Sequence, residues 1–182
     1  MAQKENNIIP MIFDEAFYRK MATQKWRQQD YKKAAEYYEK VLELSPKDFD
    51  IQQHYAQCLV KLNIGKKAER LFYENIVKDF HVAESFYELS QLNIELNEPN
   101  KAFLFGINYV ILSEDKDFRE ILEKTFEVAY TNEQKIELEA QLFSTQLLFQ
   151  FLFSQGRLEE ARTYILNQSY EIQQHLSLIH IS

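Results

Sequence analysis

Three alanines, Ala34, Ala68 and Ala102, follow one another at intervals of 34 residues. Each lies at the same place in a similar local sequence, after Tyr31-Lys32-Lys33, Gly65-Lys66-Lys67 and Pro99-Asn100-Lys101. A constant period of this length is the signature of an array of helix-turn-helix units. Because one such unit cannot bury its apolar face alone, neighbouring units must stack on one another. The period therefore predicts an all-α stack whose concave face is suited to binding another molecule.

The composition of the 182-residue chain agrees with a folded helical protein. Three glycines and three prolines are too few for a turn-rich β protein. A content of 46% hydrophobic and 27% charged residues excludes a disordered chain. The net charge of −7 argues against nucleic acid and anionic membranes, since both attract clustered lysine and arginine. We therefore expect neither as a partner.

The features that bear on location favour the cytoplasm. The single cysteine, Cys58, excludes an internal disulfide framework and is typical of a reducing compartment. The sequence does not begin with a basic region followed by an apolar core, as a signal peptide would. The most apolar segment, 142–153, has about half the ~20 residues of a membrane-spanning helix, and polar residues interrupt it. We expect a soluble, cytoplasmic protein.

Apolar side chains recur every three or four residues in the first three blocks of the period, which is a helical pattern. Asp14 is suited to capping the first helix, and Pro46 cannot continue the second. Residues 1–14 are expected to form a lead-in whose apolar part covers the first helix. The pattern predicts helices over 15–28, 31–44, 49–62, 66–78, 83–96 and 99–113.

The register changes after the third block, because Ala161, the next alanine in a matching context, lies 59 residues beyond Ala102. The section 117–141 is either a degenerate or a lengthened repeat, and both interpretations stay open. The pattern beyond Ala102 predicts helices over 117–130, 133–154 and 158–167, breaks at Thr131-Asn132 and Gln155-Gly156, and a further helix beginning at Tyr170.

The blocks 15–48, 49–82 and 83–116 resemble tetratricopeptide repeats. The last unit of the array is expected over 142–168, and its residues 145–168 resemble a fourth repeat. In this family, small residues let two antiparallel helices pack closely. The resemblance implies a right-handed α-solenoid of antiparallel helix pairs, and the 34-residue spacing favours it over half-a-tetratricopeptide and Sel1-like arrays. The small residues at the eighth and twentieth positions of the blocks are Ala22, Ala56, Ser90, Ala34, Ala68 and Ala102.

The later blocks depart from the family pattern. The closing proline of the first block, Pro46, is replaced by Phe80 in the second block and by Glu114 in the third. The twenty-fourth position is bulky in the first block, where it is Tyr38, but it is Gly106 in the third.

In this family the first helix of each pair lines a concave groove, and the resemblance carries that surface onto this chain. The implied groove runs from cationic in the first block to acidic in the third, with amide and aromatic side chains between. Such a surface suits an extended peptide or a helix of a protein partner. The implied contact residues are Arg19, Thr23, Trp26, Arg27, Gln53, Gln57, Lys61, Tyr87, Gln91 and Glu95.

Trp26 is the contact residue to test first, because it is the only tryptophan and Trp and Arg dominate interface hot spots. The alternative interpretation is that Trp26 packs between neighbouring repeats or under the lead-in.

A chaperone tail is not expected as the partner. The carboxylate clamp with which some members of the family bind such tails needs two basic residues in the third block. Glu84 and Glu88 stand at those positions, and they would repel a carboxylate.

The sequence contains no motif typical of catalysis or of cofactor binding. His54 and Cys58 are four residues apart on one predicted helix and could face one metal, but two ligands are too few. The carboxylates Glu36, Glu39 and Glu43 follow a polar helix face beside lysines, which is the pattern of a solvated surface. We expect no enzyme, no metal and no cofactor.

The last residues, 176–182, alternate apolar and polar side chains, which is a strand pattern, and they also resemble translated sequencing-adapter read-through. No polar-faced helix closes the stack, although solenoids usually need one. We expect 169–182 to hold the start of a further helix and a non-native tail after about His175. The chain would then be an N-terminal fragment of a longer bacterial tetratricopeptide repeat protein.

Three hypotheses of function follow from the sequence. The first is a non-enzymatic scaffold that binds a peptide or helix of a partner protein in its groove. The second is the ligand-sensing part of a longer regulator or enzyme, which a DNA-binding or catalytic motif in a longer reading frame would favour. The third is self-association through the uncapped C-terminal face, which light scattering would detect as a concentration-dependent mass.

Overall fold

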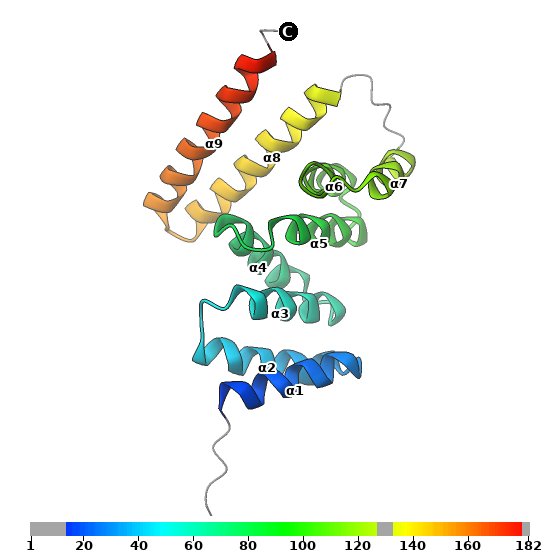
Figure 1. The fold of residues 1–182 in the computed structure, drawn as a ribbon, viewed down its shortest axis with the longest axis vertical. Coiled ribbons are helices and arrows are strands. Elements are labelled where there is room, and N and C mark those ends of the chain that lie inside the picture. Colours follow the sequence, from blue (N-terminus) through cyan, green and yellow to red (C-terminus); the bar gives the residue numbers. More distant parts are fainter. Residues whose placement is uncertain (1–13, 127–132, 180–182) are drawn as a thin grey trace, which may run out of the picture.

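The computed structural model describes residues 14–126 and 133–179, and within them the chain forms nine helices and no strand (Figure 1). The predicted all-α class is confirmed. The helices are α1 (Glu15–Arg27), α2 (Tyr31–Leu44), α3 (Phe49–Lys61), α4 (Gly65–Val77), α5 (Val82–Glu95), α6 (Pro99–Ser113), α7 (Lys116–Phe126), α8 (Glu133–Ser154) and α9 (Leu158–Ile179).

Helices α1 to α6 form three antiparallel pairs that stack along the long axis of the molecule (Figure 1). Within each pair the two helices pack on one another, and α2 and α4 then pack on the first helix of the next pair. The bounds of all six agree to within one residue with the helices predicted from the apolar pattern. The sequence period therefore corresponds to a structural repeat.

The turn inside each pair has the same backbone geometry. Gln29, Asn63 and Asn97, again 34 residues apart, adopt left-handed φ values of 59°, 59° and 57°. Gly156, between α8 and α9, adopts φ 71°. In all four turns the N–H of the following residue donates to the carbonyl oxygen five residues earlier, as in a Schellman motif. The last hairpin thus repeats the geometry of the first three.

An aspartate side chain caps the N-terminus of each of the first three helices. The carboxylates of Asp14, Asp30 and Asp48 accept hydrogen bonds from the third residue of α1, α2 and α3, at 2.8, 3.3 and 3.0 Å. Each bond satisfies one of the N–H groups that a helix leaves free at its start. Asp14 therefore caps α1, as predicted.

The small residues at the eighth and twentieth positions of each block lie where paired helices touch. Ala34, Ala68 and Ala102 are fully buried, as are Ala22 and Ala56. The third block has a serine at the eighth position, and its buried hydroxyl donates to the carbonyl oxygen of Ala102 at 2.7 Å. A polar group is thus tolerated there because it is hydrogen-bonded.

Gly106, the departure in the third block, lies against α7. A β-carbon at this position would be 2.7 Å from both terminal methyl groups of Leu122 and 3.0 Å from the Ser90 hydroxyl. The missing side chain lets Leu122 pack directly on the α6 backbone, where it is 1% exposed. Close approach of α7 therefore explains the glycine.

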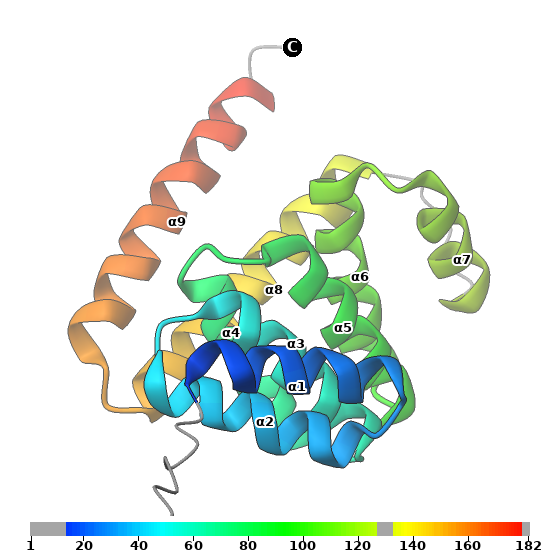
Figure 2. The same ribbon diagram turned by 60° about the horizontal axis from the view of Figure 1, so that its bottom comes forward.

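Helix α7 continues the stack, but α8 does not pair with it as α6 pairs with α5. α7 packs on α6, whereas α8 packs mainly on α6 and α9 and also reaches α4. Figure 2 shows α7 and α9 on opposite sides of the stack. The C-terminal hairpin of α8 and α9 has thus turned towards the side formed by the second helices, α4 and α6.

One expectation for the C-terminal region is wrong. Residues 158–179 form one helix, so no new helix begins at Tyr170, and residues 176–179, which alternate apolar and polar side chains, belong to it. No glycine or proline interrupts these residues, so nothing in the backbone ends the helix at residue 167. The predicted lead-in up to residue 13, the end of the helix predicted over 117–130, the break at Thr131-Asn132 and residues 180–182 lie outside the described residues.

Candidate functional site

The predicted groove residues come from the first helix of each pair, α1, α3 and α5. Thr23, Arg27, Lys61, Tyr87 and Glu95 are exposed. Their exposure leaves them accessible to a partner. Gln57, Gln91, Arg19 and Trp26 are half-buried, and Gln53 is buried.

Gln53 is a correction to the predicted contact set, because its side chain is only 4% exposed. Its amide oxygen accepts hydrogen bonds from Asn75 of α4 at 2.7 Å and from Ser85 of α5 at 3.1 Å. Gln52 extends this network, since its amide nitrogen donates to the Asn75 side-chain oxygen at 2.8 Å. Gln53 therefore joins α3, α4 and α5 inside the core and does not face a partner.

Arg19 connects the first two pairs of helices. Its guanidinium donates to Glu15 at 2.7 Å and also binds the carboxylate of Asp48, the residue that caps α3. Ser45 donates to the second oxygen of Glu15 at 2.6 Å. The bonds from Ser45 and then from Arg19 lower the pKa of Glu15. Arg19 thus has two carboxylate partners already, which makes it a weaker candidate for partner contact.

Trp26 packs within the first repeat. Its ring meets that of Tyr31 edge-on, with 5.2 Å between ring centroids, and it lies against the main core cluster. This contact favours the alternative interpretation, in which Trp26 is a packing residue.

A half-buried carboxylate lies between α3 and α5. Glu88 accepts a hydrogen bond from the Gln57 amide at 2.9 Å, and His54 lies 3.3 Å from the other end of that amide. Burial raises the pKa of Glu88, and the Gln57 bond and the nearby Lys61 offset part of that effect. The centre of the surface thus carries an acid that a cationic group of a partner would stabilise.

Tyr87 belongs to an aromatic cluster that the sequence pattern did not indicate. Its ring is 37% exposed and lies 5.2 Å, between centroids, from both Tyr109 of α6 and Phe118 of α7. Tyr109 and Phe118 are themselves 5.1 Å apart. The sequence predicted Tyr87 as a contact residue but did not predict its contact with Tyr109 and Phe118, because that contact depends on how α7 packs.

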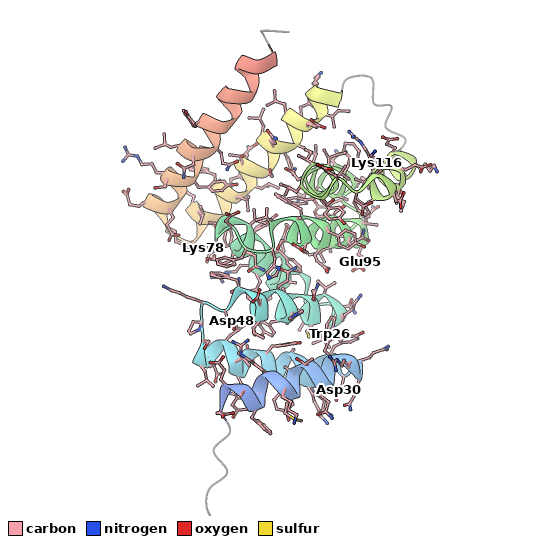
Figure 3. All side chains as sticks on the ribbon, in the orientation of Figure 1. Trp26, Asp30, Asp48, Lys78, Glu95 and Lys116 are labelled. Atoms are coloured by element: carbon pink, nitrogen blue, oxygen red, sulfur yellow. The ribbon has the colours of Figure 1, made fainter. Side chains whose placement is uncertain are left out.

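The cationic end of the surface forms a pocket on α1 of about 530 Å³. Figure 3 shows Trp26 and Glu95 on the same side of the stack, opposite Asp48 and Lys78. Among the exposed residues of the first helices, Lys20 and Arg27 lie on α1, and Glu84 and Glu95 lie on α5. The residues that line the pocket are Arg19, Lys20, Thr23, Gln24, Arg27 and Gln28.

His54 and Cys58 do not converge on one site. Cys58 is fully buried, and burial raises the pKa of its thiol to about 12. His54 is exposed and stacks on Tyr38. Across residues 14–126 and 133–179 there is no group of three or more His, Cys, Asp or Glu side chains arranged to hold a metal ion.

Comparisons with known proteins agree with this architecture. Residues 25–72 match the family model described as "Tetratricopeptide repeat", which spans α2, α3 and parts of α1 and α4. A crystal structure of MamA protein has a similar fold, with a TM-score of 0.54 and 18% identity over 88% of this chain and 92% of that one. A second MamA crystal structure has a TM-score of 0.48 and 18% identity over 86% of this chain and 96% of that one.

None of the curated proteins compared with the chain matches it in sequence. Among the described helices, none combines the length and the apolar character needed to cross a bilayer. Residues 25–72 thus match a tetratricopeptide repeat, and the 34-residue structural period continues the same arrangement of helix pairs through α6.

Proposed function

We propose that this protein is an interaction scaffold that binds an extended peptide or a helix of a protein partner along α1, α3 and α5. The proposal uses the groove residues that remain exposed. It leaves out Gln53, which is buried, and gives less weight to Arg19 and Trp26, whose side chains already have partners within the protein.

The observation that carries the proposal is the difference between the two sides of the stack. α8 packs on α4 and α6, the second helices of their pairs. The first helices keep exposed polar and aromatic side chains, among them Arg27, Lys61 and Tyr87. A partner could contact these side chains without displacing any of the described helices.

The charge along this surface gives a bound segment a direction. Lys20 and Arg27 lie on α1, whereas Glu84 and Glu95 are exposed on α5 beside the half-buried Glu88. Opposite charges across an interface fix orientation and register. A bound segment would therefore place acidic residues over α1 and basic residues over α5, with an apolar group near Tyr87.

The test is to select peptides from a random library on the full chain and to measure their dissociation constants by fluorescence anisotropy. The groove variant is Arg27→Glu/Lys61→Glu, and the control variant, Lys32→Glu/Lys66→Glu, makes the same change of charge at exposed positions on the second helices α2 and α4. We expect the groove variant to weaken binding by about tenfold or more and the control to bind as the unmodified protein does. Equal binding of every selected peptide to all three proteins would contradict the proposal.

A further inference from the structure

A second pocket lies beside α4. It has a volume of about 740 Å³ and is formed by the segment between α2 and α3, by the first turn of α3, by α4 and by the beginning of α9. The pocket shares α3 with the groove, but Phe49 and Gln52 line it from the first turn of that helix, whereas the groove residues Gln57 and Lys61 lie in its second half.

Basic side chains dominate this pocket. Five cations and two carboxylates line it, whereas the whole chain has 21 Lys and Arg against 28 Asp and Glu. The pocket is thus locally positive in an acidic protein. The cations are Lys47, Lys67, Arg70, Lys78 and Arg157, and the carboxylates are Glu74 and Glu160.

The carboxylates of the pocket are already paired. Arg157 donates to Glu74 at 2.5 Å and to Glu160 at 2.6 Å, and Lys78 donates to Glu160 at 2.8 Å. Lys67 is paired as well, with Glu39 outside the pocket at 3.2 Å.

Two cations of the pocket remain available. Lys47 and Arg70 are both exposed and have no hydrogen-bond or ion-pair partner within the described part of the chain. An anionic ligand would therefore find two unpaired cations beside a carboxylate pair that is already neutralised.

The basic residues form a row and do not converge on a point. Lys67, Arg70, Glu74 and Lys78 follow one another at three or four residues, so they share one face of α4 and its C-terminal end. At 1.5 Å per residue the row is about 16 Å long. One phosphate group would contact only part of it, whereas carboxylates spaced along a peptide could follow it.

An apolar edge adjoins the row. Phe49 lines the pocket and stacks on Phe80, with 4.4 Å between ring centroids. The Phe80 ring is 46% exposed, although it is a large apolar group. Aromatic residues, Phe among them, and arginine are enriched in protein interfaces relative to the rest of the surface.

We infer that this pocket is a second protein-binding site, which takes an acidic peptide segment with an apolar anchor. The carboxylates of the peptide pair with Lys47, in the segment before α3, and with Arg70 on α4, and its anchor packs against Phe49 and Phe80. None of the residues lining the pocket is among the predicted groove contacts, although Phe49 and Gln52 belong to the first turn of α3. The protein then connects two partners, one on each side of the stack.

The test uses a library of fluorescent peptides of about twelve residues, the length of a helix that would follow the row on α4. Each peptide carries four or more Asp or Glu residues around one aromatic residue. Binding to the full chain is measured by anisotropy for the pocket variant Lys47→Glu/Arg70→Glu, the groove variant Arg27→Glu/Lys61→Glu and the surface control Lys32→Glu/Lys66→Glu. All three change the net charge equally, so general repulsion affects them alike.

We expect acidic peptides to bind the unmodified protein. The pocket variant should bind them at least tenfold more weakly, and the groove and control variants should bind them as the unmodified protein does. Circular dichroism confirms that each variant is folded. An absence of binding by acidic peptides, or an equal loss in all three variants, would overturn the inference. It would also be overturned if inorganic phosphate or single-stranded DNA bound at Lys47 and Arg70 more tightly than the peptides.

Discussion

At the scale of single residues, the turns inside the helix pairs differ in how well they suit their conformation. Gln29, Asn63, Asn97 and Gly156 all have positive φ, a conformation in which a β-carbon is crowded. Of the four, only Gly156 lacks a β-carbon. Asparagine tolerates this region better than other residues with side chains. Gln29 is therefore the residue of the four that is least suited to a left-handed backbone conformation.

Replacement of Gln29 by glycine should stabilise the protein by about 1 kcal/mol, because the strain of the left-handed conformation is removed. The reverse change, Gly156→Ala, should destabilise it by a similar amount. A β-carbon there would meet no atom within 4 Å, so its cost comes from the backbone alone. Urea unfolding measures both, and a less stable Gln29→Gly variant would contradict this account.

Cys58 reports on the opening of the core. It is fully buried, and burial raises the pKa of the thiol to about 12. Since the thiolate is the reactive form, a thiol reagent near pH 8 should label Cys58 only after local unfolding. Labelling should accelerate as urea populates the unfolded state. Rapid labelling of the native protein would show that Cys58 is accessible.

At the scale of elements, α7 depends on a single missing side chain. Leu122 packs on the backbone of Gly106, where a β-carbon would be 2.7 Å from its methyl groups. Both residues are buried, so neither can move away without disturbing a neighbouring helix.

Gly106→Ala should therefore destabilise the protein by about 1–2 kcal/mol, because overpacking outweighs the better helix propensity of alanine. Leu122→Ala alone should cost about 2–5 kcal/mol. In the double variant the clash is absent, so the combined loss should be smaller than the sum. Additive losses would mean that Leu122 does not constrain Gly106.

The hairpin of α8 and α9 is held on α4 by ion pairs between residues far apart in the sequence. Lys78 binds Glu160 at 2.8 Å and Arg157 binds Glu74 at 2.5 Å, and Arg157 also binds Glu160, three residues away, at 2.6 Å. Hydrogen bonds first from Arg157 and then from Lys78 lower the pKa of Glu160 from 4.5 to about 2. The unfolded chain therefore takes up a proton on Glu160 at a higher pH than the folded protein does.

The contribution of Glu160 to stability should be complete above about pH 4.5 and should disappear as the pH falls to about 2. Glu160→Gln should accordingly lower the melting temperature at pH 7, and its difference from the unmodified protein should shrink between those limits. The control is Glu159→Gln, at the exposed neighbouring position. A difference that is constant with pH would contradict the role given to the ion pairs.

The period predicted α1 to α6 to within one residue because every block repeats the same small residues and turns. The period ends with the third block, and although the bounds of α8 agree with the helix predicted over 133–154, no local pattern encodes the packing of α8 on α6 and α4. Among the site residues, Gln53 was misplaced because its bond to Asn75 depends on how α4 lies beside α3. The basic pocket was missed because its residues come from three distant segments.

At the scale of the whole molecule, the repeat stack presents two chemically different sides. The first helices carry a surface that runs from basic to acidic, and its centre includes the half-buried Glu88. The other side carries the C-terminal hairpin and the basic pocket beside α4. On the proposals above, each side would bind one partner segment.

The measurement that tests the central proposal most directly is a ¹H–¹⁵N titration of the labelled protein with a peptide that the groove variant no longer binds. The account predicts that backbone amides of α1, α3 and α5 shift, among them those of Arg27, Lys61 and Tyr87, while those of α2 do not. Shifts confined to α2, α4 and α9, with α1, α3 and α5 unchanged, would contradict it.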